Sequence, residues 1–487
     1  MGACKLARLG IGLLLFLAMV QVGYGQTKIL ANEITYTSPN GMSSLIGCGS
    51  FPPYLQPCYN TPTISNSGNA LLNDNTYARL LASPGLLVGL ASYEGGIELK
   101  FAANRPANSW AFVQINADLD LLGALLGGSL GNLLGGVLGS VLLGNQEFEI
   151  QARNSLGAVV EIRNSNQNFS TDRVRIVVDK IGNHYLAIKP DQVFDRIRII
   201  NRSVSAVGLG TQYTFDVYNA FYLDNIDNCS GIFSTSFEGA GIDLDLLGLG
   251  GTLTSNLHRA IDGDLETYST LSGGLLEVGG SLRQSFYLGN LSSANSSINI
   301  TIGAAPSILN VELLSNISFM AYNGSDEVEN KTLTELGLSV DLLGLLVDGS
   351  PVSFGFRPQA AYDRVEIRIN QALGLGTGES LRVYEVSGTP HIDLIPEPNL
   401  SDALTGCEEL DLMDAIANRQ LNYYEYKFYT QSIGGIALSS SIVTETGTYY
   451  IEAIDIETGC SSLRVAVNAT VSPLPGKPHL TISDVIN

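Results

Sequence analysis

Two stretches of the chain, K-P-D-Q-V-F-D-R-I-R-I at residues 189–199 and R-P-Q-A-A-Y-D-R-V-E-I at residues 357–367, follow one pattern. Each has a basic residue before a proline, an Asp-Arg pair six residues after that basic residue, and then alternating apolar side chains. Apolar residues at every second position are typical of a half-buried β-strand. The pattern therefore predicts that one β-rich unit occurs twice in the chain.

Further pairs of segments extend this repeat in the same order. They are residues 70–78 with 260–269, F-V-Q-I ending at Ile115 with I-N-I-T-I ending at Ile302, the segments ending at Asn154 and Asn323, and those ending at Tyr218 and Tyr384. Asn154 lies 36 residues before Pro190, and Asn323 lies 35 residues before Pro358. The first copy carries 16 extra residues after Ile115. Matching motifs at matching intervals predict one fold used twice.

Short alternating runs, separated by Gly, Asn, Asp and Pro turns, predict an all-β fold of sandwiches or jelly rolls. The stretch A-I-D-G-D-L-E-T-Y at residues 260–268 resembles the motif that leads into the sheet of galactose-binding-like jelly rolls, the discoidin or coagulation-factor type C modules. The first copy departs from it with N-D-N. The resemblance implies two tandem galactose-binding-like jelly rolls, at residues 26–225 and 226–389.

A third module follows a joint that contains proline. Cys407, E-Y-K-F-Y at residues 425–429 and T-G-T-Y-Y-I-E-A at residues 446–453 resemble the Ig-like repeats of large secreted Bacteroidetes surface proteins. The resemblance implies an Ig-like β-sandwich at residues 390–475, in an architecture associated with gliding motility and adhesins. We expect residues 476–487 to be a linker or the start of a further module, so that the chain stops partway through this architecture.

The N-terminus predicts export. Lys5 and Arg8 precede an apolar run from Leu9 to Val22, and small residues follow that run. This order predicts a signal peptide over residues 1–25, and the apolar run is short for a membrane anchor. Export predicts a secreted or cell-surface protein whose cysteines form disulfides.

Five cysteines remain after cleavage. The economical pairs are Cys48 with Cys58 and Cys407 with Cys460, which leave Cys229 over. A bond from Cys229 to Cys48 or Cys58 stays an alternative.

Composition argues against a nucleic-acid partner. The 487 residues include 47 acidic and 26 basic side chains, for a formal charge of -21, and this excess repels phosphate backbones. Only 15% of residues are charged, against about 25% in ordinary soluble domains, and 53 are glycine. Much of this bias lies in the signal peptide, in the tract from Leu121 to Gly144 and in short D-L-L-G stretches.

The tract from Leu121 to Gly144 contains no charged residue and has glycine at every fourth position from Gly127 to Gly139. Its length would allow a membrane span. Against a span, no Lys or Arg flanks the tract closely, and it interrupts a repeat that otherwise stays on one side of a membrane. We therefore expect an apolar flap that packs on the sheet or faces a partner.

Catalytic motifs are weak, so we expect a protein that is not an enzyme and that has no catalytic residues. The four histidines lack metal-ligand spacing. A formal G-x-S-x-G at residues 127–131 lies in the Leu/Gly tract without the strand and helix that a nucleophile elbow needs.

One turn suits a hard cation. Asp262, Asp264, Glu266 and Thr267 offer oxygen atoms in a tight glycine-containing turn, which predicts a structural Ca²⁺ site. No other cofactor is required. The alternative interpretation is an Asx turn that only leads into a strand.

One strand face carries aromatic residues. If Ala111, Val113 and Ile115 match Ile298, Ile300 and Ile302, then Trp110, Phe112 and Gln114 lie on a face that is polar in the second copy. Stacking of a sugar on these rings would give a ligand-binding site. The favoured alternative is that leucines of the insert cover the rings, because an uncovered aromatic face is costly.

Together these features predict a non-catalytic exported protein that acts in adhesion or surface display, with a surface glycan or an envelope protein as partner. The alternative is a carbohydrate-binding component of a secreted system that degrades polysaccharides.

Overall fold

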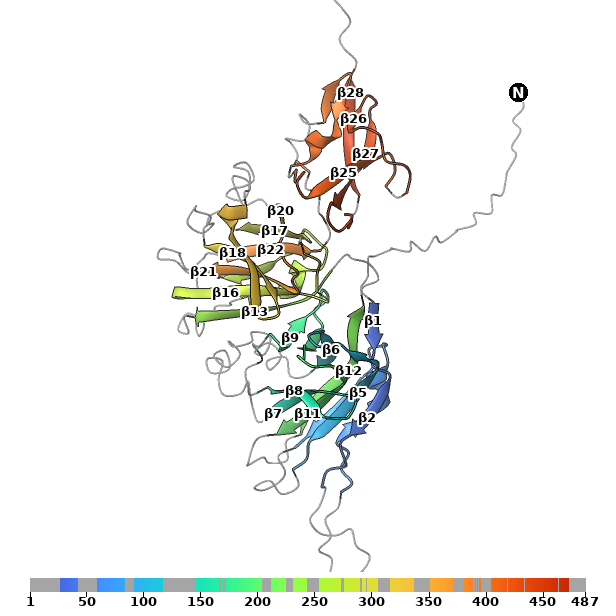
Figure 1. Cartoon of the computed structure of the whole chain (residues 1–487), viewed down its shortest axis with the longest axis vertical. Helices are drawn as coiled ribbons and strands as arrows, with labels where there is room; N and C mark the ends of the chain where they lie inside the picture. The colour runs from blue at the N-terminus through green and yellow to red at the C-terminus, as the bar shows by residue number, and fades with distance from the viewer. Residues whose placement is uncertain are drawn as a thin grey trace, which may run out of the picture.

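A computed structural model shows three β-sandwich modules along the chain (Figure 1). The structure describes residues 27–42, 59–83, 92–116, 146–165, 169, 172–203, 212–224, 231–242, 254–272, 276–289, 291–294, 296–304, 316–336, 351–370, 380–388, 390, 392, 394–395, 404–417, 419–432, 434–462 and 464–472. Within these ranges every regular element is a β-strand or a short 3₁₀-helix. The predicted all-β fold, with two tandem jelly-roll sandwiches and an Ig-like sandwich, is confirmed.

Several predictions fall outside the described residues. They concern the signal peptide, Cys48, Cys58, Cys229, the tract from Leu121 to Gly144, and residues 476–487. Within the part that is described, no helix is long and apolar enough to cross a membrane.

The first module packs two antiparallel sheets against each other. One sheet has the order β2-β5-β11-β7-β8. Its strands are β2 (Glu33–Thr37), β5 (Gly95–Arg105), β11 (Phe194–Ser203), β7 (Gln146–Arg153) and β8 (Val159–Asn164). The other has the order β3-β4-β12-β6-β10-β9, with β1 also paired to β12. Its elements are β1 (Thr27–Leu30), β3 (Ile64–Ser65), η1 (Ser67–Leu71), β4 (Ala78–Ala82), β6 (Ala111–Asn116), β9 (Val174–Val178), β10 (His184–Ile188) and β12 (Tyr213–Asp224).

The second module repeats the strand order of the first in both sheets, without counterparts of β1 and β9 among the described residues. Its sheets run β13-β16-β21-β18-β19 and β14-β15-β22-β17-β20. The elements are β13 (Ile232–Ile242), β14 (Thr254–Ser255), η2 (Leu257–Ala260), β15 (Ser269–Ser272), β16 (Leu276–Leu288), β17 (Ile298–Ala304), β18 (Ile317–Asn323), β19 (Asp326–Thr332), η4 (Leu333–Leu336), β20 (Val352–Phe356), β21 (Arg364–Asn370) and β22 (Ser380–Ser387). The segment pairs of the sequence repeat fall on corresponding elements, such as β11 with β21 and β6 with β17. Residues 70–78 and 260–269 connect η1 to β4 and η2 to β15.

The copies also agree in a backbone detail. Asn66 and Asn256 stand directly before η1 and η2, and each has a φ of 53°. Asparagine tolerates this left-handed conformation better than most residues with a side chain. The same unusual turn therefore leads into both sandwiches.

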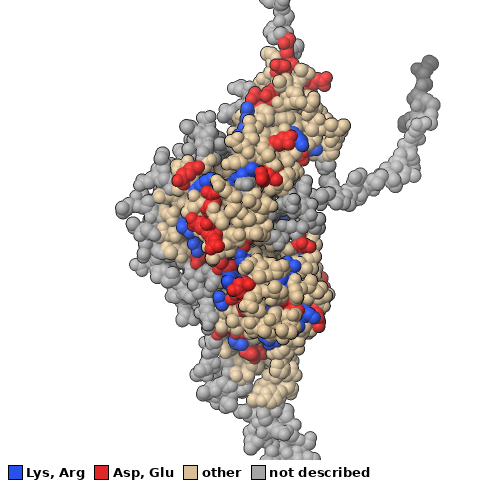
Figure 2. All heavy atoms as spheres, viewed as in Figure 1, with Lys and Arg blue, Asp and Glu red and all other residues tan. Residues whose placement is uncertain are grey.

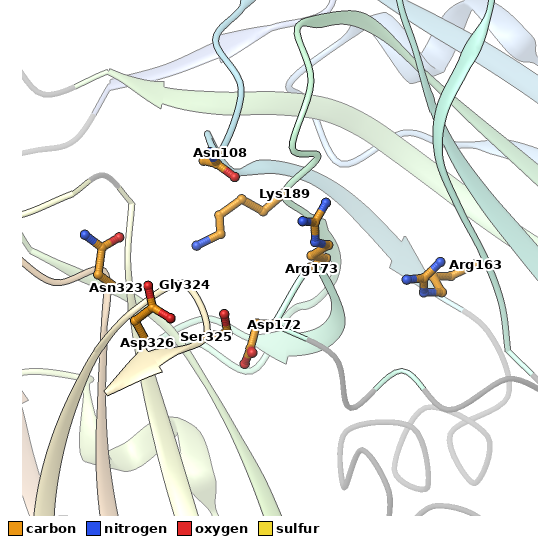
Figure 3. Close-up of a pocket in the computed structure, with 9 residues that line it drawn as sticks. All are labelled: Asn108, Arg163, Asp172, Arg173, Lys189, Asn323, Gly324, Ser325 and Asp326. Carbon is orange, nitrogen blue, oxygen red and sulfur yellow. The ribbon is translucent and has the colours of Figure 1, made fainter. Parts of the chain in front are cut away.

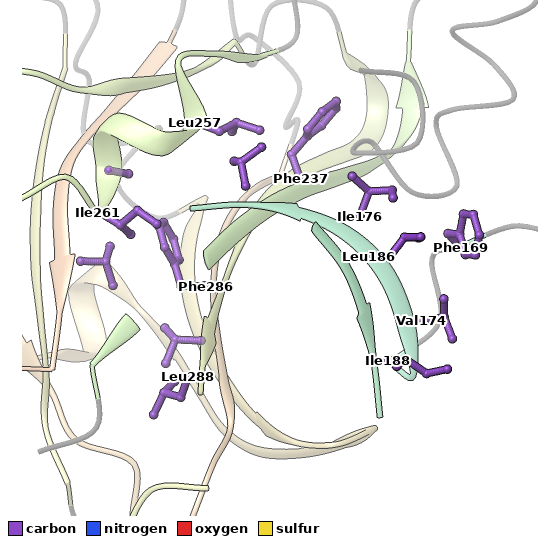
Figure 4. Close-up of a cluster of buried hydrophobic side chains, with 14 of the residues drawn as sticks. Phe169, Val174, Ile176, Leu186, Ile188, Phe237, Leu257, Ile261, Phe286 and Leu288 are labelled. Atoms are coloured by element: carbon purple, nitrogen blue, oxygen red, sulfur yellow. The ribbon is translucent and has the colours of Figure 1, made fainter. Parts of the chain in front are cut away.

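The first two modules share a sheet and a core. β9 pairs with β13 at Val178 and Thr235, which joins one sheet of each module into a twelve-stranded sheet. Ile176 of β9 and Phe237 of β13 belong to one buried apolar cluster that runs through both sandwiches (Figure 4). The two modules are therefore packed together rather than joined only by a linker.

The third module has its own apolar core. A four-stranded sheet of order β23-β28-β27-β25 faces the pair β24-β26. The elements are β23 (Thr405–Cys407), β24 (Leu410–Asp411), η5 (Leu412–Ala415), β25 (Tyr424–Tyr429), β26 (Ile442–Val443), β27 (Gly447–Asp455) and β28 (Val465–Ser472).

The predicted disulfide between Cys407 and Cys460 is wrong. Cys407 is a free, exposed cysteine, whereas Cys460 is disulfide-bonded. Cys407 pairs with Ser472 of β28 near the start of β27, and Cys460 follows the far end of β27. A strand advances about 3.3 Å per residue, so the nine residues of β27 separate the two cysteines far beyond the Cα distance of about 7 Å that a disulfide allows.

Candidate functional site

A polar cleft of about 600 Å³ lies where the first two modules meet (Figure 3). Residues of the first module come from the loop before β6, from the end of β8, and from the segments before β9 and after β10. Residues of the second module come from the turn between β18 and β19. The lining residues are Asn108, Arg163, Asp172, Arg173, Lys189, Asn323, Gly324, Ser325 and Asp326.

An intermodule ion pair closes one wall of the cleft. The buried Lys189 Nζ lies in contact with Asp363 Oδ2 of the second module. The Asp363 Oδ1 atom accepts a hydrogen bond of 3.1 Å from the Gly324 backbone N–H. Arg364 Nη1 reaches Asp172 Oδ1 of the first module at 2.7 Å. These pairs fix the turn between β18 and β19 against the first module.

The first-module wall is also held by ion pairs. Arg173 Nη1 lies 2.8 Å from Asp191 and 3.3 Å from Glu161, and Arg163 lies 2.9 Å from the same Glu161. The hydrogen bond from Arg173 to Asp191 helps to raise the pKa of the guanidinium. These ion pairs hold both arginines in position on this wall.

The second-module wall is a turn that exposes polar atoms. Gly324 has a φ of 65°, which favours glycine, and an added Cβ would lie 3.6 Å from the Lys189 Nζ. Asn323, Ser325 and Asp326 around it are exposed. Opposite them, Asn108 takes a φ of 60°, and its backbone N–H donates to the Pro190 carbonyl at 2.7 Å. Amide, hydroxyl and carboxylate groups thus face one space, where they can hydrogen-bond a polar ligand.

The aromatic residues singled out in the sequence lie beside this cleft, in the joint itself. Trp110 is 5% exposed and Phe112 is fully buried. The Trp110 ring meets Tyr287 of the second module edge-on, with 5.8 Å between centroids, and Phe112 lies 4.6 Å from Phe233. Gln114 is half-buried between β10 and β12. Side chains of the second module cover these rings, so neither ring presents an open face on which a sugar could stack.

The acidic turn at residues 262–267 of the second module is held by hydrogen bonds among its own residues. The Asp264 N–H donates to Asp262 Oδ1 at 2.9 Å, and the Glu266 N–H donates to Asp264 Oδ1 at 3.0 Å. The Thr267 hydroxyl donates to Asp262 Oδ2 at 2.8 Å. Among the described residues, no group of three or more His, Cys, Asp or Glu is placed to hold a metal ion. These hydrogen bonds are those of an Asx turn. An Asx turn is the alternative interpretation of the residues predicted to bind Ca²⁺.

A carboxyl group absent from the sequence predictions lies under this turn. Glu385 Oε2 accepts a hydrogen bond of 3.0 Å from the Gly263 N–H. Burial raises the pKa of Glu385 to about 8, against the lowering effect of that hydrogen bond, and the nearby Asp262 charge raises it further.

Sequence reasoning missed the cleft because its residues come from separate loops. Only Lys189 carried a usable clue, since it occupies the position of Arg357 in the repeated motif. Figure 2 shows basic and acidic side chains next to one another over the visible face, so the charged residues of this face do not form a separate basic field.

Comparison with known proteins supports the assignment of the third module as an Ig-like domain. Residues 397–473 match a family model described as an Ig-like domain, CHU_C associated. No curated protein matches the chain in sequence.

Solved structures give only weak likenesses. A Streptococcus pneumoniae fucose-binding module is 14% identical, with a TM-score of 0.20, and the match covers 34% of this chain and 95% of that one. Allantoicase from Saccharomyces cerevisiae is 9% identical, with a TM-score of 0.21 and coverages of 60% and 76%. Tandem CBM51 modules of a family 98 glycoside hydrolase from Streptococcus pneumoniae are 10% identical, with a TM-score of 0.17 and coverages of 73% and 97%. The strand order of the paired sheets, and not these scores, identifies the first two modules as β-sandwiches.

Proposed function

We propose that this chain is an exported, non-catalytic protein of the cell surface that acts in adhesion or display. The observation that carries the proposal is the way the modules are joined. A shared sheet and core link the first two, and Arg357 pairs with the buried Asp455 between the second and third. Modules held at fixed angles present a surface at a defined distance and orientation, which suits contact with another surface.

The second candidate function is carbohydrate binding, and the cleft between the first two modules favours it. Its volume of about 600 Å³ lies within the usual range of about 300–1,000 Å³ for small-ligand sites. Sugar hydroxyls both donate and accept hydrogen bonds, and Asn323, Ser325 and Asp326 offer both kinds of partner. Such a site would recognise a glycan through hydrogen bonds rather than through ring stacking.

A glycan array probed with the mature chain tests carbohydrate binding. For a glycan that binds, calorimetric titration should show at least about a tenfold weaker Kd for Asp326→Ala, because one hydrogen bond to a charged group is worth about 1.5–3 kcal/mol. Asn330→Ala is the control, since Asn330 is exposed on the same hairpin but does not line the cleft. Unchanged binding by Asp326→Ala and Asn323→Ala would place the glycan elsewhere.

Adhesion is tested on whole cells. Cells that display the chain should adhere to a host or abiotic surface more than cells that lack it, and protease added outside the cells should remove both the protein and the adhesion. Equal adhesion by the two strains would argue against this role.

A further inference from the structure

The repeat places two matching residues at one corner of each jelly roll. In the first module Ile188 of β10 pairs with Ala111 of β6, and Lys189 and Trp110 lie one residue beyond this pair. In the second module Phe356 of β20 pairs with Ile298 of β17, and Arg357 and Ser297 lie one residue beyond. Lys189 corresponds to Arg357, and Trp110 corresponds to Ser297.

Both corners touch the module that follows in the chain. Lys189 pairs with Asp363, and Trp110 packs on Tyr287, both in the second module. Lys189 Nζ also lies 5.2 Å from the centroid of the Trp110 ring, so the two corner residues contact each other.

The second corner also forms an ion pair and a tyrosine contact, here with the third module. Arg357 Nη2 lies 2.8 Å from Asp455 Oδ2, and the Ser297 hydroxyl donates to the same carboxylate. The Arg357 guanidinium also lies 4.6 Å from the Tyr423 ring centroid and donates to the Tyr423 carbonyl at 3.1 Å. Gly355 of β20 adds a backbone N–H that donates to Gln420 at 2.9 Å.

The aspartates that pair with the two corners have similar surroundings, although one lies in a jelly roll and the other in the Ig-like module. Asp363 and Asp455 are 5% and 2% exposed. Each also accepts backbone N–H groups of a turn: Asp363 from Gly324, and Asp455 from Glu457 and Thr458 at 3.0 and 2.9 Å. These backbone hydrogen bonds help to orient each carboxylate, and buried ion pairs need such additional hydrogen bonds.

We propose that this corner is one docking surface used twice, and that its partner is a β-sandwich that presents a buried aspartate beside a tyrosine. Lys189 or Arg357 supplies the positive charge that pairs with the aspartate. Trp110 or Ser297, directly before β6 or β17, makes a second contact with the same partner module. The corner sets the angle between each jelly roll and its successor.

Asp195 provides an internal comparison. It occupies the position of Asp363 in the first copy and pairs with its own neighbour, Arg196, at 3.4 Å. Asp→Asn at Asp363 and at Asp195 therefore neutralises matching carboxylates, one paired with another module and one paired, within the described residues, with its own neighbour.

Distances between spin labels test the proposal in the full chain. Leu156 and Leu291 are 92% and 54% exposed, so Leu156→Cys with Leu291→Cys, in a Cys407→Ser background, reports on the first joint. Leu291→Cys with the native exposed Cys407 reports on the second joint. We expect narrow distance distributions at both joints when no corner residue is changed. Lys189→Met or Asp363→Asn should broaden the distribution at the first joint alone. Arg357→Met should broaden the distribution at the second joint alone.

Lys189→Arg, which keeps the positive charge opposite Asp363, should retain the narrow distribution at the first joint. Asp195→Asn should leave both distributions unchanged, as should Arg79→Met, which breaks an ion pair of 2.7 Å inside the first module. Unchanged distances in Lys189→Met and Arg357→Met, or equal broadening in Arg79→Met, would overturn the proposal. If the first-joint variants do not fold, as judged by circular dichroism, Arg357→Met and Asp455→Asn at the second joint decide the question.

Discussion

Glu385 is a half-buried carboxyl group whose charge opposes folding at high pH. Burial raises its pKa to about 8 in the folded chain, well above the value of about 4.3 for an unfolded chain. The group stabilises the fold fully below pH 4, and this contribution is lost as the pH rises towards 8 and beyond. We expect Glu385→Gln to match the wild type at pH 4 and to be more stable at pH 9 by on the order of 2 kcal/mol, measured by urea unfolding.

Glu266→Gln is the matched control for Glu385→Gln. Glu266 belongs to the acidic turn that lies over Glu385, and its side chain is exposed. A Glu385→Gln variant whose stability follows that of Glu266→Gln at both pH values would show that burial does not penalise the Glu385 charge.

Gly95 at the start of β5 lies where two other backbones come close. An added Cβ would lie 2.4 Å from the Thr63 carbonyl and 2.6 Å from the Leu81 nitrogen. Because both atoms belong to backbone, the clash cannot be relieved by a side-chain rotation. We expect Gly95→Ala to lower the unfolding free energy by about 1–3 kcal/mol in thermal or urea unfolding. Gly68→Ala, where the added Cβ meets nothing within 4 Å, should change it much less.

At the scale of strands, periodicity and spacing were enough to predict the sandwiches. Apolar residues alternate in β11 and β21 because one face of each strand enters the core, and this alternation is visible in the local sequence. The other face depends on neighbours far along the chain. The rings of Trp110 and Phe112 are covered by Tyr287 and Phe233, which no local pattern could indicate.

The cysteines show the same limit at the element scale. Two cysteines in one module suggest a bond, but only the parallel pairing of β23 with β28 shows that Cys407 lies at the wrong end of β27. We expect Cys407 to react with a thiol reagent in the native chain, because its side chain is exposed and free. Cys407→Ser should remove this reaction and leave the melting temperature almost unchanged. A native chain in which Cys407 stays unmodified until denaturant is added would contradict the assignment.

At the scale of the whole molecule, the cores predict two units of unfolding. One apolar cluster runs through the first two sandwiches, which also share the twelve-stranded sheet, whereas the third module has a separate core. Residues that share a core lose their packing together, so the first two modules should unfold as one cooperative unit. Scanning calorimetry of the full chain should therefore show two transitions rather than three.

Core substitutions assign these transitions. Ile176 and Ile451 are both fully buried, one in each core, and Ile→Ala at such sites costs about 2–5 kcal/mol. We expect Ile176→Ala to lower the melting temperature of the larger transition, and Ile451→Ala to lower that of the smaller one. Ile302→Ala, in the second module, should shift the same transition as Ile176→Ala. Separate transitions for Ile176→Ala and Ile302→Ala would mean that the shared sheet does not couple the two jelly rolls, and that the corner contacts at Lys189 and Trp110 act between modules that unfold independently.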